Sequence, residues 1–431
     1  MDKTISIVAT GDSFITQRLP HNDPNLQKLR DYLMKHDVRF TNLEVLLHNF
    51  DVYPSATSGG TWSAARPQVL SDLKWLGFNM FAWANNHTLD WCHNGLLSTR
   101  KYLEEAECIH AGAGINLAEA SQPRYLDTPQ GRVALIGTTS TANDWHRAGA
   151  QRPDVLGRPG VNALRYNAIH KVTKEDLARL KSIIGKTEIN AKRMLDEKEG
   201  FAKKQSGFIV GTLHFEIGEP GTETRMNEQD AERIRQSITE ASRQADVVLV
   251  SHHGHEMKGM DKDRTADFMR EYAHMCIDSG AHAYLGHGPH ILRGIEIYKS
   301  RPIFYSLGDF IFQNDSVEKQ PTEFYDIYNL GPTNTPSDGF DARSENETKG
   351  LVVDRRVFES VVVSFNIFQG NIKAINLTPI SLGFEFGRSR RGRPQLSSVE
   401  DGVRILNDLQ RLSNEFGTVM DIKDGLGIIN I

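Results

Sequence analysis

Short apolar runs alternate with amphipathic segments through the first 140 residues of the chain. The apolar runs predict strands at 5–9, 38–43, 78–83, 109–111 and 132–138. Between them, helical spacing of apolar residues predicts helices at 26–36, 67–76 and 95–106. Gly77, directly after the second of these segments, is typical of a helix C-terminus. This repeated alternation predicts an α/β layered sheet.

The pattern loosens after residue 143. We interpret 143–205 as an insertion over the sheet edge, since it contains a Gly- and Pro-rich part and a strongly charged helical stretch that is typical of a solvated helix face. Strands and helices resume from residue 208 up to about 312. The polar stretch 313–350 predicts a long loop or lid. The last part, 351–431, predicts a hairpin and an amphipathic helix that pack on the 1–312 core.

Composition limits the classes of function. The net charge of -5 argues against a nucleic-acid partner, which normally requires a basic footprint, so anionic substrates would be drawn by local cations or metals. The three cysteines have no paired or metal-type spacing and predict reduced thiols. Met1 leads directly into a strand without a signal peptide, and no apolar stretch approaches a membrane span. We therefore expect a cytoplasmic protein without a membrane partner.

Polar side chains follow the predicted strands at several points along the chain. They are Asp12, Glu44, Asn86, His87, His252, His287 and His290. A strand that stops at a turn and then presents such groups is how an α/β sheet places ligands at its carboxyl edge. Taken singly, Asp12 also fits an ordinary turn, and the Asn86-His87 pair fits a capped turn with a surface histidine. Asp90 is placed to fix the tautomer of His87.

Carboxylates, a carboxamide and imidazoles together form a mixed oxygen and nitrogen donor set. Such a set suits Mn, Fe, Zn or Co better than Ca or Mg. Seven ligating side chains exceed what one ion needs, so we expect two divalent transition metals about 3.5 to 4 Å apart with one bridging acid. Such a pair lowers the pKa of bound water toward about 7, so a metal-bound hydroxide would serve as the nucleophile.

Six motifs, in this order, resemble those of the CapA family, which is associated with capsule and poly-γ-glutamate synthesis and related to calcineurin-like metallophosphoesterases. The motifs are Gly11-Asp12, Asn42-Leu43-Glu44, Ala84-Asn85-Asn86-His87 with Asp90, His252-His253-Gly254-His255-Glu256, Gly286-His287-Gly288-Pro289-His290 and Tyr305-Ser306-Leu307-Gly308-Asp309-Phe310. The resemblance implies a four-layer α/β/β/α metallophosphoesterase-like sandwich with two metals.

The resemblance also implies roles for the site residues. Asp12 and His290 would hold one metal, and Glu44 would bridge. The other metal would be held by Asn86, His252 and His287. His87 would act as the acid or stabilise an oxyanion, and Glu256 would be an acid beside the ligands or on the substrate side.

The chain departs from the family pattern at His253, Gly288 and Asp309, where the family usually has Trp, His and Asn. We also expect no membrane anchor, although many family members carry one. We therefore expect a hydrolase of a small-molecule or peptide-like anionic substrate, cleaving an amide such as a γ-glutamyl bond. The alternatives are a phosphoesterase that uses the same site and a non-catalytic partner in poly-γ-glutamate or capsule synthesis.

Overall fold

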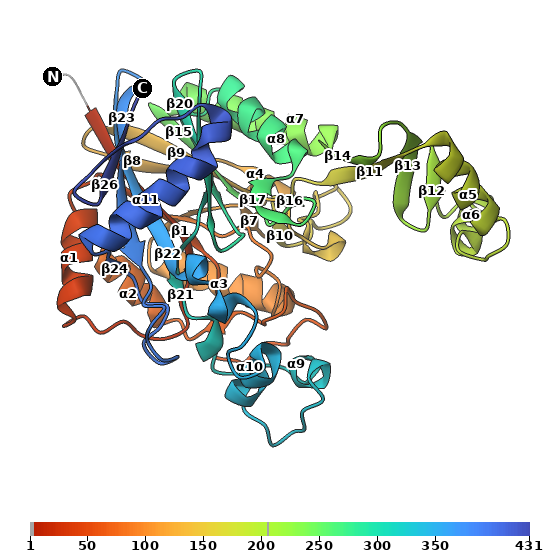
Figure 1. Ribbon diagram of the computed structural model, residues 1–431, viewed down its shortest axis with the longest axis horizontal. Coiled ribbons are helices and arrows are strands. Elements are labelled where there is room, and N and C mark those ends of the chain that lie inside the picture. Colours follow the sequence, from red (N-terminus) through yellow and green to blue (C-terminus); the bar gives the residue numbers. More distant parts are fainter. Residues whose placement is uncertain (1–3, 205–206) are drawn as a thin grey trace.

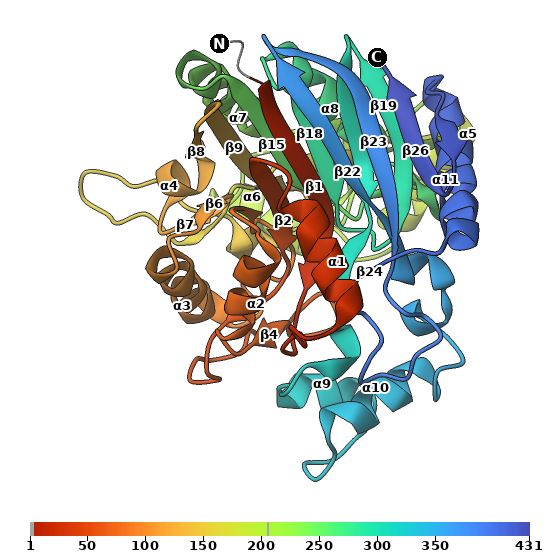
Figure 2. The same ribbon diagram turned by 90° about the vertical axis from the view of Figure 1, so that its left-hand side faces the viewer.

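Two mixed sheets face each other in the computed structural model, which describes residues 4–204 and 207–431 (Figure 2). In the described residues the larger sheet has ten strands in the order β25-β26-β23-β22-β1-β2-β5-β6, with β21 on β1 and β24 on β23. Their bounds are β1 (Thr4–Phe14), β2 (Val38–Leu43), β5 (Met80–Ala82), β6 (Ile109–Ala111), β21 (Asp309–Phe312), β22 (Glu359–Phe368), β23 (Asn371–Ser381), β24 (Gln395–Leu396), β25 (Asp421–Lys423) and β26 (Leu426–Asn430).

The second sheet has the order β19-β20-β18-β15-β9-β8. Its strands are β8 (Arg124–Thr128), β9 (Gly131–Thr139), β15 (Val247–His253), β18 (Ala283–His287), β19 (Leu292–Tyr298) and β20 (Arg301–Leu307). The four central strands β9, β15, β18 and β20 are parallel. Since β1, β2 and β5 of the larger sheet are also parallel, each sheet has an edge where several strands end together.

Side-chain alternation along the strands divides the core into three apolar layers. On β15, Val247 and Leu249 belong to the layer between the sheets, whereas Val248 and Val250 belong to the layer beneath the outer helices. Helices α1 (Pro24–Leu33), α2 (Val69–Leu76) and α3 (Cys92–Glu105) cover the outer face of the larger sheet, and α7 (Glu228–Gln244) and α8 (Asp267–Asp278) cover the second sheet (Figures 1 and 2). The predicted four-layer α/β/β/α sandwich is confirmed.

The insertion differs in extent and in structure from the predicted one. Residues 166–204 and 207–226 form a four-stranded sheet with two helices that stands away from the sandwich (Figure 1). Its elements are β11 (Tyr166–Val172), α5 (Lys174–Ile184), α6 (Ala191–Glu199), β12 (Phe208–Val210), β13 (Leu213–Ile217) and β14 (Gly221–Met226). The preceding part belongs to the core, because Val161 and Leu164 are fully buried there. Gln205, the end of the predicted insertion, lies outside the described residues.

The segment predicted as a loop or lid contains two short helices. These are α9 (Thr322–Ile327) and α10 (Pro336–Ser344), and Phe324 and Phe340 anchor them to Trp62. The C-terminal part supplies strands β22 to β26 of the larger sheet, and α11 (Val399–Ser413) packs across β19, β23 and β26. The C-terminal part is therefore an integral part of the larger sheet, and it does not only pack on the 1–312 core.

The remaining elements are short. They are β3 (Leu46–Leu47), β4 (Ala64–Ala65), β7 (Ala113–Gly114), α4 (Leu117–Ser121), β10 (Gly160–Val161), β16 (Met257–Lys258) and β17 (Asp261–Thr265). Among residues 4–204 and 207–431, no helix combines the length and the apolar character that crossing a bilayer requires.

Candidate metal centre

Four strand ends from the two sheets converge on one buried cluster of acids and imidazoles. Asp12 lies near the end of β1, Glu44 directly follows β2, and His253 and His287 are the last residues of β15 and β18. The two histidines are paired in register across neighbouring strands. Gly11 allows β1 to approach the opposite loop, because a Cβ at this position would lie 1.8 Å from the carbonyl oxygen of Gly308.

Asp12 is the fixed point of the cluster. Its Oδ1 lies 3.2 Å from Nδ1 of His287 and 3.6 Å from Nδ1 of His253. Asn42 Nδ2 and the backbone N–H of Gly288 donate hydrogen bonds to its two oxygens, at 2.7 and 2.8 Å. Burial opposes ionisation of Asp12, but the two imidazoles and their hydrogen bonds hold its pKa well below the ordinary value. Asp12 is therefore positioned as an ionised carboxylate.

Glu44 is fully buried, and neither of its carboxylate oxygens has a hydrogen-bond partner among the described residues. Oε1 lies 3.5 Å from Nε2 of His253 and 3.8 Å from Nε2 of His87. Burial, and next the negative charge of Asp12, raises the pKa of Glu44 well above its ordinary value. An ionised carboxylate that is buried without hydrogen bonds destabilises the fold, so a cation bound at this position would stabilise it.

His290 and Asp309 complete the cluster from the other side. Nδ1 of His290 lies 2.9 Å from Oδ1 of Asp309, and burial raises the pKa of Asp309 to about 6. Oδ2 of Asp309 has no hydrogen-bond partner in the described chain. His290 has a φ of 59°, a conformation that a non-glycine residue adopts at a cost of about 1 to 3 kcal/mol. Local backbone strain of this kind is concentrated at functional sites.

The donor atoms of this cluster gather in three overlapping groups, each within 4.8 Å. The groups are Asp12, His253 and His287; Glu44, His255 and His290; and Asp12, Glu44, His290 and Asp309. Burial lowers the pKa of His253 to about 4 and that of His255 below its ordinary value, so both imidazoles are neutral and able to ligate. With the unpartnered oxygens of Glu44 and Asp309, these groups fit a metal ion.

His87 stands beside the metal-binding groups and is held by a carboxylate. Nδ1 of His87 lies 2.6 Å from Oδ2 of Asp90, the partner predicted from the sequence, and Oδ2 also accepts a hydrogen bond from the Ser63 backbone at 2.8 Å. Asn85 fixes the turn by accepting the backbone N–H of His87. This arrangement keeps a proton on Nδ1 and turns Nε2 toward Glu44.

A cleft with a volume of about 520 Å³ opens beside these groups. Its walls include Asn86, His146, Tyr166, His255 and Glu256. Oδ1 of Asn86 is buried without a hydrogen-bond partner in the described residues, and so are both ring nitrogens of His146. His146 follows no predicted strand, so the strand-end pattern could not reveal it; only its position in the fold does.

The sequence of the chain matches a known protein family. The sequence model of the family described as "Bacterial capsule synthesis protein PGA_cap" matches residues 6–314. The chain belongs to this family. Among PGA_cap relatives, the protein y4sH of Sinorhizobium fredii is 34% identical, with 99% of this chain and 93% of that protein covered. The capsule biosynthesis protein CapA of Bacillus anthracis is 26% identical, with 65% and 52% covered. The PGA biosynthesis protein CapA of Bacillus subtilis is 37% identical, with 26% and 30% covered.

The structure does not bring His252 to the three groups of donor atoms, although the resemblance to the family implied that it is a metal ligand. Successive side chains of β15 point to opposite faces, so His253 lies between the sheets and His252 faces the outer helices. Nδ1 of His252 lies 2.9 Å from Oγ1 of Thr138, its Nε2 lies 3.0 Å from Oγ of Ser140, and its ring contacts Tyr272. His253, and not His252, supplies a donor atom to the groups that could hold a metal ion.

Two residues that depart from the PGA_cap sequence pattern belong to the three groups of donor atoms. His253 and Asp309, where the family usually has Trp and Asn, each supply a donor atom. The third, Gly288, has a φ of 121° and donates its backbone N–H to Asp12. The structure thus gives these positions a direct part in the centre, beyond the change of pocket wall expected from the sequence.

Asn86 and Glu256 lie at the cleft, outside the three groups of His, Asp and Glu donors. The carboxylate of Glu256 accepts hydrogen bonds from Ser140 Oγ at 2.7 Å and Thr141 Oγ1 at 3.0 Å, and burial raises its pKa.

Proposed function

We propose that this PGA_cap protein is a metal-dependent hydrolase that cleaves an amide, such as a γ-glutamyl bond, in a small or peptide-like anionic substrate. The observation that carries the proposal is Glu44. Its carboxylate is fully buried, has no hydrogen-bond partner among the described residues, and lies near the imidazoles of both His253 and His87. Such a carboxylate is stabilised when it binds a cation.

Two divalent ions from the set Mn, Fe, Zn or Co fit the overlapping groups. Asp12, His253 and His287 would hold one ion, and Glu44, His255 and His290 would hold the other. Asp309 would add a ligand from the group that it forms with Asp12, Glu44 and His290. When bound, such ions bring the pKa of water to near neutrality and polarise a carbonyl or phosphoryl oxygen. This supplies a nucleophile without a serine or cysteine.

The residues beside the donor groups are placed for proton transfer. His87, oriented by Asp90, presents Nε2 toward the donor groups and would give a proton to the leaving group or stabilise an oxyanion. Burial keeps Glu256 protonated to higher pH than an ordinary glutamate, so it would serve as a hydrogen-bond donor to substrate. Asn86 would contribute its unpartnered Oδ1 to an ion or to substrate.

The amide is favoured over other bonds by the relatives. The two Bacillus relatives are named as a PGA and a capsule biosynthesis protein. A phosphoesterase with the same residues is the second candidate. It is favoured by the α/β/β/α architecture, which resembles that of metallophosphoesterases, and by the ability of paired ions to neutralise a phosphoryl group.

Turnover by metal-loaded protein tests this proposal. The protein is stripped of metal, reloaded separately with Mn, Fe, Zn or Co, and incubated with γ-glutamyl amides and with aryl phosphates. We expect amide cleavage that falls at least 100-fold in Glu44→Gln and in His87→Gln and is unchanged in His170→Gln, which alters the insertion. Cleavage of phosphates alone would select the phosphoesterase. Inertness toward both panels with loaded metal would contradict hydrolysis and favour a non-catalytic partner in polymer synthesis.

A further inference from the structure

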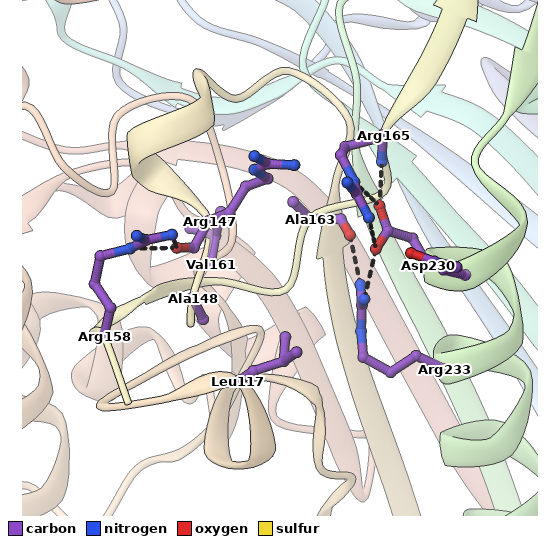
Figure 3. A pocket seen from close by; sticks show the side chains of 10 residues that line it. Leu117, Arg147, Ala148, Arg158, Val161, Ala163, Arg165, Asp230 and Arg233 are labelled. Carbon is purple, nitrogen blue, oxygen red and sulfur yellow. Dashed lines mark hydrogen bonds and ion pairs between the residues drawn. The ribbon is translucent and has the colours of Figure 1, made fainter. Parts of the chain in front are cut away.

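A second cavity, with a volume of about 370 Å³, lies between α4, α7 and the segment that leads to the insertion. Figure 3 shows four arginines around it: Arg147, Arg158, Arg165 and Arg233. Asp230 is the one carboxylate among the described residues that line the cavity. The cavity has no part in the proposed chemistry at the metal centre.

Asp230 neutralises only part of this positive charge. Its oxygens accept hydrogen bonds from Arg165 Nε at 2.6 Å and from Arg233 Nη1 at 2.6 Å (Figure 3). Arg147 has Asp144 at 3.3 Å, but the Asp144 side chain is 86% exposed, so solvent screens this pair. Arg158 donates to the backbone carbonyl of Arg147 and not to an acid. Four guanidinium groups against one buried carboxylate leave the cavity strongly cationic.

The arginines differ in how many of their donors are used. Arg233 donates to Asp230, to the carbonyl of Ala163 and to Asn162, which fixes it as a structural group. Arg147 and Arg158 use their donors on backbone carbonyls and a screened acid, and each keeps guanidinium N–H groups for another acceptor. Guanidinium groups bind carboxylate and phosphate through two N–H groups at once.

The cationic cavity and the catalytic cleft share a wall. His146 and Tyr166 line the cleft, and their sequence neighbours Arg147 and Arg165 line the cavity. Neighbouring Cα atoms are about 3.8 Å apart, so only the thickness of one chain segment separates the two spaces at these points. Both spaces are open to solvent, so an elongated ligand in the cleft can reach the arginines across this segment.

We propose that this cavity is a subsite for an anionic group, carboxylate or phosphate, on the ligand that occupies the cleft. The identity of that ligand as the substrate rests on the proposed function. The arginines would then select substrates that carry an anionic group beyond the bond that is cleaved, and Arg147 and Arg158 would make the direct contacts.

Binding of defined anions to the full-length, metal-loaded protein tests the subsite. The probes are γ-linked triglutamate and inorganic phosphate, measured by calorimetry at low salt. We expect triglutamate to bind more tightly than phosphate, and its Kd to rise at least tenfold in Arg147→Gln and further in the double variant with Arg158→Gln. Arg152→Gln, which removes an exposed arginine of the same loop paired with Asp154, should leave Kd unchanged.

Three results would overturn the subsite. These are triglutamate binding that survives the double variant, phosphate binding as tight as that of triglutamate, which indicates a free-anion site, and the absence of binding by the parent. Arg147→Lys keeps the charge and guards against misfolding, so it should bind more tightly than Arg147→Gln. Binding that depends on the arginines without any turnover would retain the subsite and reject the hydrolase. Turnover with an unchanged KM in the double variant would retain the hydrolase and reject the subsite.

Discussion

His252 and His253 are adjacent, equally buried imidazoles on opposite faces of β15, and this makes them a matched pair for testing the metal ligands. His253→Gln removes a donor from the group that includes Asp12 and His287. Outer partners of metal ligands are worth about 10- to 100-fold in affinity, so a direct ligand should be worth at least about 100-fold, or about 2.7 kcal/mol. His252→Gln disturbs contacts outside the donor groups, with Thr138, Ser140 and Tyr272, which should cost about 1 to 3 kcal/mol of unfolding free energy.

Thermal unfolding with and without added Mn or Zn measures the difference. At a metal concentration of about 100 times Kd, binding stabilises the parent by about 2.7 kcal/mol, whereas a variant with 100-fold weaker affinity gains about 0.4 kcal/mol. For 431 residues the unfolding entropy is about 0.9 kcal/mol/K, so Tm should rise about 3 °C in the parent and under about 0.5 °C in His253→Gln. His252→Gln should start from a lower Tm and keep the full rise. A rise that is lost in His252→Gln and kept in His253→Gln would refute this ligand set.

Three further predictions concern residues around the centre. His146→Gln should lower kcat/KM about 10- to 100-fold with metal content unchanged, since His146 lines the cleft and both of its ring nitrogens are buried without a partner among the described residues; unaltered kinetics would exclude a contact with substrate. Asp90→Asn should lower kcat by at least about 100-fold because His87 loses its fixed tautomer, and a change confined to KM would contradict this role. Asp230→Asn should cost about 1 to 2 kcal/mol of unfolding free energy near neutral pH, reduced by the 40% exposure of Arg165. Although burial opposes it, hydrogen bonding to arginines holds the pKa of Asp230 below its ordinary value. The contribution of ionised Asp230 to the free energy of unfolding is therefore complete above about pH 4 and is lost as the pH falls through the folded-state pKa. Urea denaturation should show a larger difference between the parent and Asp230→Asn at about pH 6 than at about pH 3.

The sandwich and most of the centre could be predicted from the sequence because a recognisable sequence pattern marks the end of each strand. A buried run followed by Gly-Asp, Leu-Glu or Asn-His locates a side chain at the sheet edge, whatever the rest of the fold. Asp12, Glu44, His287 and His290 meet in the structure for this reason. The tautomer partner Asp90 could be predicted because it is only three residues from His87.

The assignment of His252 was wrong because a motif gives the order of residues but not the face of a strand. Period-two alternation shows which face a side chain takes only when one face is polar. The buried run 247–250 is apolar on both faces, so the sequence does not show on which face His252 lies. His146 and the arginine cavity could not be predicted, since they depend on how 144–166 folds back between the sandwich and the insertion. The extent of the insertion was also misjudged, because its charged helices give a stronger pattern than its short, partly exposed strands.

Elemental analysis of the purified protein, before and after reloading with Mn, Fe, Zn or Co, is the most direct test of a dinuclear metal centre. We predict about two transition-metal equivalents per chain, falling in Asp12→Asn and in Glu44→Gln. Protein that takes up none of these metals, even after reloading, would contradict the centre and the hydrolase built on it.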